Sequence, residues 1–195
     1  MSIEEFIIQV FGCIAEEYDL IVKPPLPLRK RGYNPQLSES EARTMEIVGE
    51  FVSIDTDKGI WRYFRNHWHN WFPNLGSRAN FVKQSSHRFR IKQLIWQRVA
   101  HKLGAFSDPI HIVDGFPMPV CQLARAKPST CFRGEAQEGH CATNKPTYYG
   151  CRGQVVISFN GIITDFTVVP ANVEERDSLP EITYKVKWLL LGDQG

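Results

Sequence analysis

The sequence predicts a helical N-terminal domain over residues 1–107, followed by an α/β domain with a mixed sheet over residues 108–195. Three observations support this fold class, α+α/β. Apolar residues recur at helical spacing as far as about residue 103, and after Ser107 the period shortens to the alternation of a strand. The second half then has the order strand, insertion, hairpin, helix and strand, and a strand–helix–strand crossover favours a parallel final strand.

Five helices are expected in the N-terminal domain. An apolar stripe from Ile3 to Ile14 predicts the first, and the prolines and glycine of residues 23–36 predict an extended linker after it. Ser38 precedes Glu41 by three residues, which is the spacing of a capping box and predicts the start of the second helix. The other helices are expected over about 57–71, 77–88 and 90–103, with Lys92 and His101 among the outward residues of the last.

Strand patterns dominate after Ser107. Asn160-Gly161 lies between two β-rich runs and is a strong hairpin signal. Pro180 is expected to interrupt or bend the helix that contains it. The expected elements are a strand over 109–120, a long insertion over 118–149, a hairpin over 153–169, a helix over 173–186 and a short, fully buried strand over 187–193.

Composition argues against several classes of protein. No apolar run approaches the roughly 20 residues that a membrane-spanning helix needs, so no membrane partner is expected. Glu4 and Glu5 stand where a secretory signal carries Lys or Arg, which argues against export. The five cysteines are odd in number, which argues against a disulfide framework and favours a reducing cytoplasm.

A basic segment indicates nucleic-acid binding. Residues 60–107 contain nine Lys or Arg and no Asp or Glu, and neutralised phosphates release counterions. A solvated helix face is the alternative for the charges, and a place in the core is the alternative for the interleaved aromatic residues. The residues expected to contact DNA are Arg88, Arg90 and Lys92 in this segment, and Arg125, Arg133 and Lys145 in the expected insertion.

Two aspartates are candidate ligands of a divalent cation. In the alternating strand, Asp114 shares a face with Ile112 and Phe116 that is expected to be buried, where an unpaired carboxylate is costly. Asp193 follows a strand, at the end where open α/β sheets bind ligands. On neighbouring parallel strands the two carboxylates would lie about 5 Å apart, and carboxylate oxygens suit Mg²⁺ or Mn²⁺. A turn or cap role is the alternative, more so for Asp193, which precedes Gln194.

Other metal sites are weaker candidates. His67 and His69 lie two residues apart, so a helix would direct them to different faces. The cysteines from Cys121 onward and His140 lack the paired CxxC spacing of a zinc site.

Five ordered blocks carry a resemblance that covers nearly the entire chain: IVDGFPMPVCQLARA, FRGEAQEGHCA, YYGCRGQVVIS, ANVEERDSLPEI and LLLGDQG. Together with the helical segment TMEIVGEFVSIDTDKGIWRYFRNHWHNWFP, they resemble the transposases of the insertion-sequence family numbered nine-eighty-two. The resemblance implies a member of the DDE superfamily with a ribonuclease-H-like sheet and a helical region that engages element ends. It further implies metal-dependent cleavage and strand transfer of DNA at those ends, with Mg²⁺ or Mn²⁺ as the cofactor.

By this resemblance, Asp114 matches the first catalytic acid and Asp193 matches the second. The third acid of the family, a Glu, lies farther along, beyond a segment that residues 1–195 lack, and Gln194 stands where the family usually has Lys. We therefore expect an incomplete ribonuclease-H-like domain and an inactive or impaired enzyme.

Two other functions remain open from the sequence. One is a non-catalytic DNA-binding product that occupies element ends or inhibits full-length transposase by mixed assembly. The other is an unstable fragment of a decayed element. The expected partners are DNA at element ends and target, together with a second copy or full-length transposase, and the expected location is the bacterial cytoplasm at the nucleoid.

Overall fold

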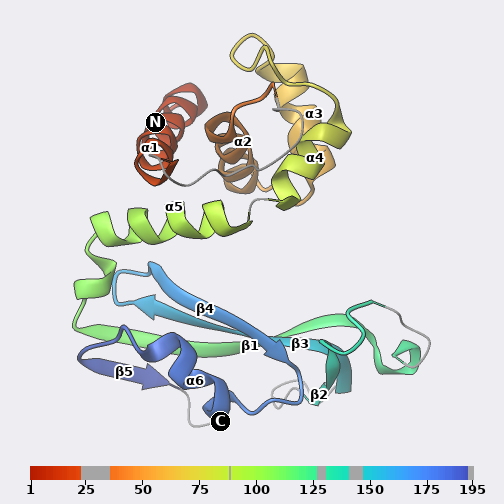
Figure 1. Cartoon of the computed structure of the whole chain (residues 1–195), viewed down its shortest axis with the longest axis vertical. Coiled ribbons are helices and arrows are strands. Elements are labelled where there is room, and N and C mark those ends of the chain that lie inside the picture. The colour runs from red at the N-terminus through yellow and green to blue at the C-terminus, as the bar shows by residue number, and fades with distance from the viewer. Residues whose placement is uncertain (23–35, 88, 127–130, 141–146, 193–195) are drawn as a thin grey trace. The chain divides into compact units, whose positions relative to one another are not determined.

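A computed structural model describes residues 1–22, 36–87, 89–126, 131–140 and 147–192 (Figure 1). The chain divides into two compact units, Met1–Val99, here called the helical unit, and Ala100–Gly195, here called the sheet unit. Six α-helices and a mixed sheet of five strands occur among the described residues, which confirms the predicted combination of a helical part and an α/β part.

The helical unit contains the five predicted helices. They are α1 (Ile3–Val22), α2 (Glu39–Phe51), α3 (Asp57–His67), α4 (Arg78–His87) and α5 (Phe89–Lys102), whose last residues extend into the sheet unit. The capping box is confirmed, because the Ser38 hydroxyl accepts from the Glu41 backbone N–H and the Glu41 carboxylate accepts from the Ser38 N–H. Most of the expected linker, residues 23–35, lies outside the described residues.

Two apolar clusters hold these helices together. The larger joins α1, α2, α3 and α4, with Met45, Val48, Phe64 and Phe81 almost completely buried at its centre. The smaller joins Ile14 of α1 to Ile91 and Ile95 of α5. The apolar stripes that predicted the helices are therefore the faces that pack.

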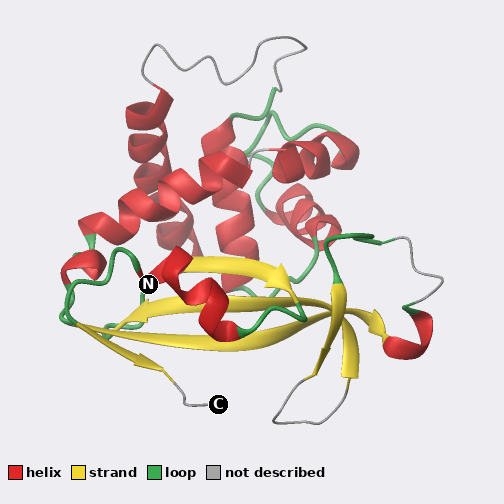
Figure 2. Cartoon of the chain, turned by 60° about the horizontal axis from the view of Figure 1, so that its bottom comes forward, coloured by secondary structure: helices red, strands yellow, loops and turns green. Residues whose placement is uncertain are grey.

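The sheet unit is built around one long strand. Strand β3 (Thr147–Ser158) pairs antiparallel with β1 (Ile110–Gln122) along one side. On its other side it pairs first with β2 (Gln137–His140) and then with β4 (Ile163–Pro170), as Figure 2 shows in yellow. The hairpin between β3 and β4 is confirmed, and Gly161 at its turn adopts a positive φ of 80°.

The last strand, β5 (Leu189–Gly192), pairs parallel with β1, as the crossover rule predicted. Helix α6 (Glu175–Thr183) precedes it and contains Pro180. Ile182 of α6 packs against Val113 and Val156, so this helix covers one face of the sheet. The prediction that β5 is fully buried is wrong, because Leu189 and Leu191 point away from that face and are 50% and 47% exposed.

The prediction of a long insertion over residues 118–149 is also wrong in part. The β1–β3 ladder continues to Gln122 and Tyr148, with a register shift after Pro119, and β2 lies within the expected insertion. Pro117 and Pro119 have the parity of Pro109, whose carbonyl accepts from Leu189 of β5. Their missing N–H groups therefore face the side of β1 where β5 has already ended, so the two prolines do not break the ladder.

Candidate functional site

The parallel pairing of β5 with the first residues of β1 ends one residue before the two sequence-predicted acids. The parallel pairing runs from Ile110 opposite Leu189 to Val113 opposite Gly192. This last pair immediately precedes Asp114 and Asp193 in the sequence. Asp193 itself lies outside the described residues, so the register is described up to the residue before it.

The face of β1 that carries Asp114 differs from the expectation. The residues of this face, here called the Asp114 face, are exposed rather than buried: Ile112, Asp114, Phe116 and Met118. Helix α6 packs on the opposite face, where His111 and Val113 are buried. A solvated carboxylate needs no counter-ion, so burial gives no argument for a cation at Asp114. A cation site at Asp114 is therefore inferred from the pairing of β1 with β5.

Asp114 has a local hydrogen bond that orients it. Its Oδ1 accepts from the backbone N–H of Gly115 at 2.8 Å. No other hydrogen bond or ion pair of this carboxylate occurs within the described part of the chain. The second oxygen is therefore available for a ligand.

A further carboxylate, Glu175, lies on the other side of β1. A Cβ atom at Gly115 would lie 2.5 Å from Glu175 Oε1, so the glycine makes room for this side chain. Arg152 Nη1 lies 3.9 Å from the same oxygen and donates to the Val173 carbonyl at 3.1 Å. Because successive residues of a strand face opposite sides, Glu175 and Asp114 are not directed toward a common ion.

The first turn of α6 is fixed to β3 by buried polar groups. Gln154 is 1% exposed, and its amide nitrogen donates to the Glu175 carbonyl at 3.1 Å. The Ser178 hydroxyl donates to Gln154 Oε1 at 2.8 Å. Gln154 was not among the residues predicted from the sequence, although a polar residue inside the apolar run of β3 indicates that its side chain has a partner.

No other metal site emerges among the described residues, where no group of three or more His, Cys, Asp or Glu is able to hold an ion. Cys13, Cys121 and Cys151 are free thiols. Cys141 lies outside the described residues.

The predicted DNA-contacting residues that the structure describes belong to two different units. Arg88 and Lys145 lie outside the described residues, and Arg90 is exposed on α5. Lys92 is 36% exposed, and its Nζ lies 2.9 Å from Glu46 Oε1 on α2. The remaining two, Arg125 and Arg133, are exposed in the sheet unit.

The acid-free segment is therefore partly neutralised from elsewhere in the sequence. Lys92 pairs with Glu46, and Arg98 of α5 pairs with Glu17 of α1, which is completely buried. A count of charges over residues 60–107 alone therefore gives α5 more unpaired positive charge than it has, because the acids that pair with it come from α1 and α2.

The aromatic residues of this segment divide into two groups. Trp61 and Trp68 pack against the larger apolar cluster, and Trp61 Nε1 donates to the Gly76 carbonyl at 3.0 Å. Trp71 and Phe89 are 44% and 58% exposed. Trp61 and Trp68 therefore belong to the core, which was the alternative to a DNA-binding role, whereas Trp71 and Phe89 are accessible to solvent.

The region around β2 forms a shallow pocket of about 400 Å³. Tyr149 of β3 contributes to its lining, whereas Tyr148, the other tyrosine of the predicted insertion, is buried. The remaining lining residues are Ala126, Gln137, Glu138 and Asn172.

Comparison with known proteins bears on the sheet unit. Residues 105–195 match the family model described as the transposase DDE domain, a range that contains all five strands and α6. No significant match was found among curated proteins or among solved structures. No helix in the described ranges is long and apolar enough to cross a membrane. The family match supports a transposase of the DDE superfamily, which acts on DNA and generally uses divalent metal ions.

Proposed function

We propose that this chain acts as a DDE transposase of the insertion-sequence family numbered nine-eighty-two, as the match of residues 105–195 to the transposase DDE domain supports. Residues 1–107 bind DNA, and residues 108–195 form a ribonuclease-H-like catalytic part. Asp114 and Asp193 are the two catalytic acids that residues 1–195 contribute to metal-dependent cleavage and strand transfer at element ends. The antiparallel strands followed by a crossover to the parallel β5 support this reading of the sheet.

One observation carries the proposal: the parallel register between Val113 and Gly192. Neighbouring strands lie about 5 Å apart. Continuing the same register by one residue would set Asp114, within β1, beside Asp193. Two acids that are far apart in the sequence would then lie on adjacent parallel strands, with Asp193 just after the carboxyl end of β5, where α/β sheets bind ligands.

The residues present fit a hard divalent cation. Asp114 offers an exposed carboxylate with one oxygen unused by Gly115, and a carboxylate is the ligand that Mg²⁺ and Mn²⁺ prefer. When bound, such an ion lowers the pKa of an attacking hydroxyl and stabilises the leaving oxygen. Asp114 and Asp193 would hold the ion and, through it, fix where the scissile phosphate lies.

The accessible cations of both units would bind DNA. Arg125 and Arg133 belong to the sheet unit and are exposed, and Arg90 is exposed on α5. We also assign Arg88, Lys92 and Lys145 to this role. The Lys92 ammonium forms an ion pair with Glu46 as well. The active assembly would contain a second copy or full-length transposase and would work at the nucleoid.

A second candidate is a non-catalytic product that binds element ends and inhibits full-length transposase. It is favoured by the exposed cations Arg90, Arg125 and Arg133, which can bind DNA without a metal ion. In that case Asp114 and Asp193 would be dispensable for the biological effect.

A cleavage assay separates the two candidates. The purified chain is incubated with Mg²⁺ or Mn²⁺ and a plasmid that carries both genomic flanks of its coding sequence. The variants are Asp114→Asn and Asp193→Asn, with Asp177→Asn as the control, because Asp177 is an exposed acid on α6.

Cleavage in the flanks that is lost in Asp114→Asn and Asp193→Asn but retained in Asp177→Asn supports the transposase. Binding of the flanks without cleavage, unchanged in all three variants, supports the inhibitor instead. If the chain neither binds nor cleaves the flanks, both candidates are wrong.

A further inference from the structure

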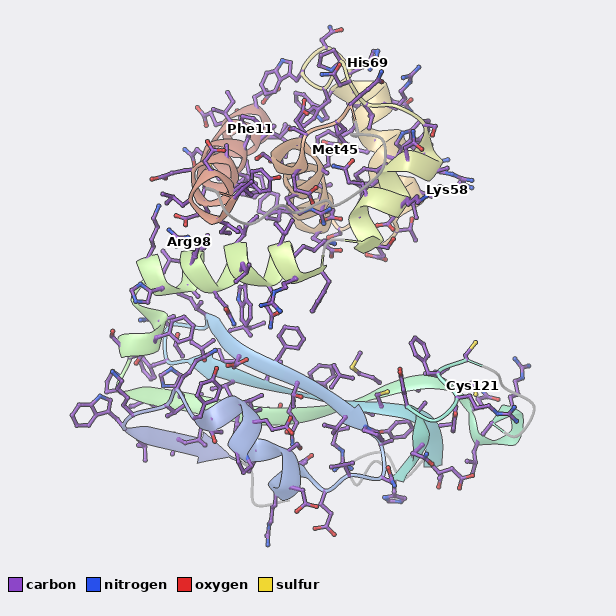
Figure 3. The ribbon with its side chains drawn as sticks, in the orientation of Figure 1. Phe11, Met45, Lys58, His69, Arg98 and Cys121 are labelled. Carbon is purple, nitrogen blue, oxygen red and sulfur yellow. The ribbon has the colours of Figure 1, made fainter. Side chains whose placement is uncertain are left out.

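Three cations of α3 lie on one face of that helix. Lys58, Arg62 and Arg65 occupy positions i, i+4 and i+7, which neighbour each other on a helix surface, and all three are exposed. Asn66 is exposed beside Arg62. We call Lys58, Arg62 and Arg65 the α3 stripe. Lys58 projects away from the helices, whereas Met45 of α2 lies among them (Figure 3).

The opposite face of α3 is fixed in the core of the helical unit. Ile60 and Phe64 are 3% and 0% exposed and belong to the larger apolar cluster. Gly49 of α2 allows a close approach, because a Cβ atom there would lie 2.5 Å from Ile60 Cγ1. These contacts hold α3 in one rotation about its axis, so the α3 stripe is presented on a rigid support.

Both ends of α3 are also fixed. The Thr56 hydroxyl accepts from the Gly59 N–H at 3.1 Å and caps the first turn. Trp61 Nε1 donates to the Gly76 carbonyl at 3.0 Å and ties the helix to the segment before α4. A ligand of the α3 stripe would therefore meet an ordered helix and would not have to order it.

The α3 stripe is uncompensated, in contrast to other cations of the helical unit. Arg43 is paired with Glu39 and Glu46, and Lys92 and Arg98 are paired with acids of α2 and α1. Lys58, Arg62 and Arg65 form no ion pair with any residue that the structure describes. Their charge is thus available to an external anion.

We infer that the α3 stripe binds the phosphate backbone of duplex DNA, an inference that rests on the proposed function. The stripe spans seven residues of rise, or about 10.5 Å. Duplex DNA carries about six phosphate charges over that length. Two arginines and a lysine on one rigid helix suit this target, because arginine binds phosphate through two parallel hydrogen bonds and lysine as a point charge.

The main DNA contact of the helical unit then lies on α3 rather than on the start of α5. Arg90 forms no ion pair with a residue in the described ranges, but Lys92 is paired with Glu46. A helix whose apolar face is fixed and whose polar face is basic also has the dimensions that the major groove of B-DNA admits.

The salt dependence of DNA affinity tests the inference. Affinity of the purified full chain is measured at several salt concentrations by fluorescence anisotropy, with a short duplex from the genomic flank and an unrelated duplex as probes. The variants are K58Q/R62Q/R65Q, the single Arg62→Gln and the charge-preserving K58R/R62K/R65K. Arg176→Gln with Lys187→Gln removes exposed charge from the sheet unit as the matched control.

Each phosphate contact contributes about 0.9 to the slope of log affinity against log salt. We expect the slope to fall by about 2.7 in K58Q/R62Q/R65Q and by about 0.9 in Arg62→Gln, equally on both probes. The charge-preserving variant and the sheet-unit control should keep the wild-type slope. Circular dichroism should show unchanged helix content, since all three side chains are exposed.

Two negative outcomes are distinguishable. A wild-type chain that binds DNA with a slope that neither K58Q/R62Q/R65Q nor Arg62→Gln changes would overturn this inference and leave the proposed function intact. A wild-type chain that binds neither duplex would overturn the proposed function and the inference with it.

Discussion

Replacement of Arg43 by methionine should strongly destabilise the helical unit. The Arg43 side chain is 3% exposed and forms ion pairs of 3.0 Å with Glu39 and 2.6 Å with Glu46. It also donates to the Gln84 carbonyl at 3.0 Å and to the Ser85 carbonyl at 3.5 Å, near the end of α4. One buried guanidinium thus joins α2 to α4. Methionine keeps most of the volume and removes all of these bonds.

The expected cost follows from the burial of the remaining carboxylate. The side chain of Glu39 is 2% exposed, so this buried carboxylate would lose its ion pair with Arg43 and keep the hydrogen bond from the Gln84 amide at 3.3 Å. Removing one partner of a buried ion pair costs about 3–5 kcal/mol. For a unit of this size, 1 kcal/mol corresponds to about 4–8 °C in Tm, so the Tm should fall by at least about 12 °C. Glu46 should contribute less, because Lys92 also neutralises it.

Tryptophan fluorescence is a suitable assay because four of the five tryptophans, all but Trp188, lie in the helical unit. A Trp188→Phe background makes the signal specific to that unit. Arg43→Met combined with Glu39→Gln should recover part of the loss, since the double change removes the buried negative charge along with the guanidinium. A Tm shift below about 4 °C for Arg43→Met alone would refute the reasoning.

Three further predictions concern single residues. Ser38→Ala should lower the stability of the helical unit by about 1 kcal/mol through loss of the capping box, measured by urea unfolding, and no loss would show that the cap is redundant. Gly150→Ala should destabilise the sheet unit by about 1–3 kcal/mol or more, because the new Cβ would collide with the Met118 carbonyl, and an unchanged melt would contradict that close approach. Burial lowers the pKa of Lys185. Its hydrogen bonds with Asp165 (2.7 Å) and with Tyr184 have the larger combined effect and raise the pKa above its ordinary value. The stability gained from this pair should thus be complete below the unfolded pKa and be lost as pH rises through the folded pKa; Lys185→Met should remove this alkaline loss, and an identical pH profile would count against it.

Local signals predicted the helices and the hairpin well. The Ser38 capping box and the Asn160-Gly161 turn are specified by neighbouring residues, and both occur as expected. The parallel pairing of β5 also followed, because the handedness and direction of a crossover are properties of short connected segments.

The sequence could not show which face of the sheet is covered. The alternation along β1 divides the strand into two apolar faces, one with His111 and Val113 and the other with Ile112 and Phe116. The choice between them depends on where α6 packs, more than sixty residues later in the chain. The exposure of Asp114 was mispredicted for this reason, and the same limit led to the wrong burial of β5.

The basic surface was predicted only in part, because charge compensation is also non-local. Arg98 and Glu17 are 81 residues apart in the sequence and lie within hydrogen-bond distance. A count of charges in a window does not detect such a pair. The rotation of α3, which separates Lys58, Arg62 and Arg65 from the core, was readable from helical periodicity once the bounds of that helix were known.

The strands of the sheet differ in how many neighbours they are hydrogen-bonded to, so the hydrogen bonds of some strands should break more readily than those of others. Strand β3 is hydrogen-bonded on both sides, to β1 and to β2 and β4, whereas the four residues of β5 pair with β1 alone among the described residues. Amide protons of β5 should exchange with solvent through small local openings, while those of central β3 should wait for global unfolding. If Asp114 and Asp193 hold a divalent ion, as proposed above, that ion would stabilise the pairing of β5 with β1 and slow exchange in β5 before it alters any other strand.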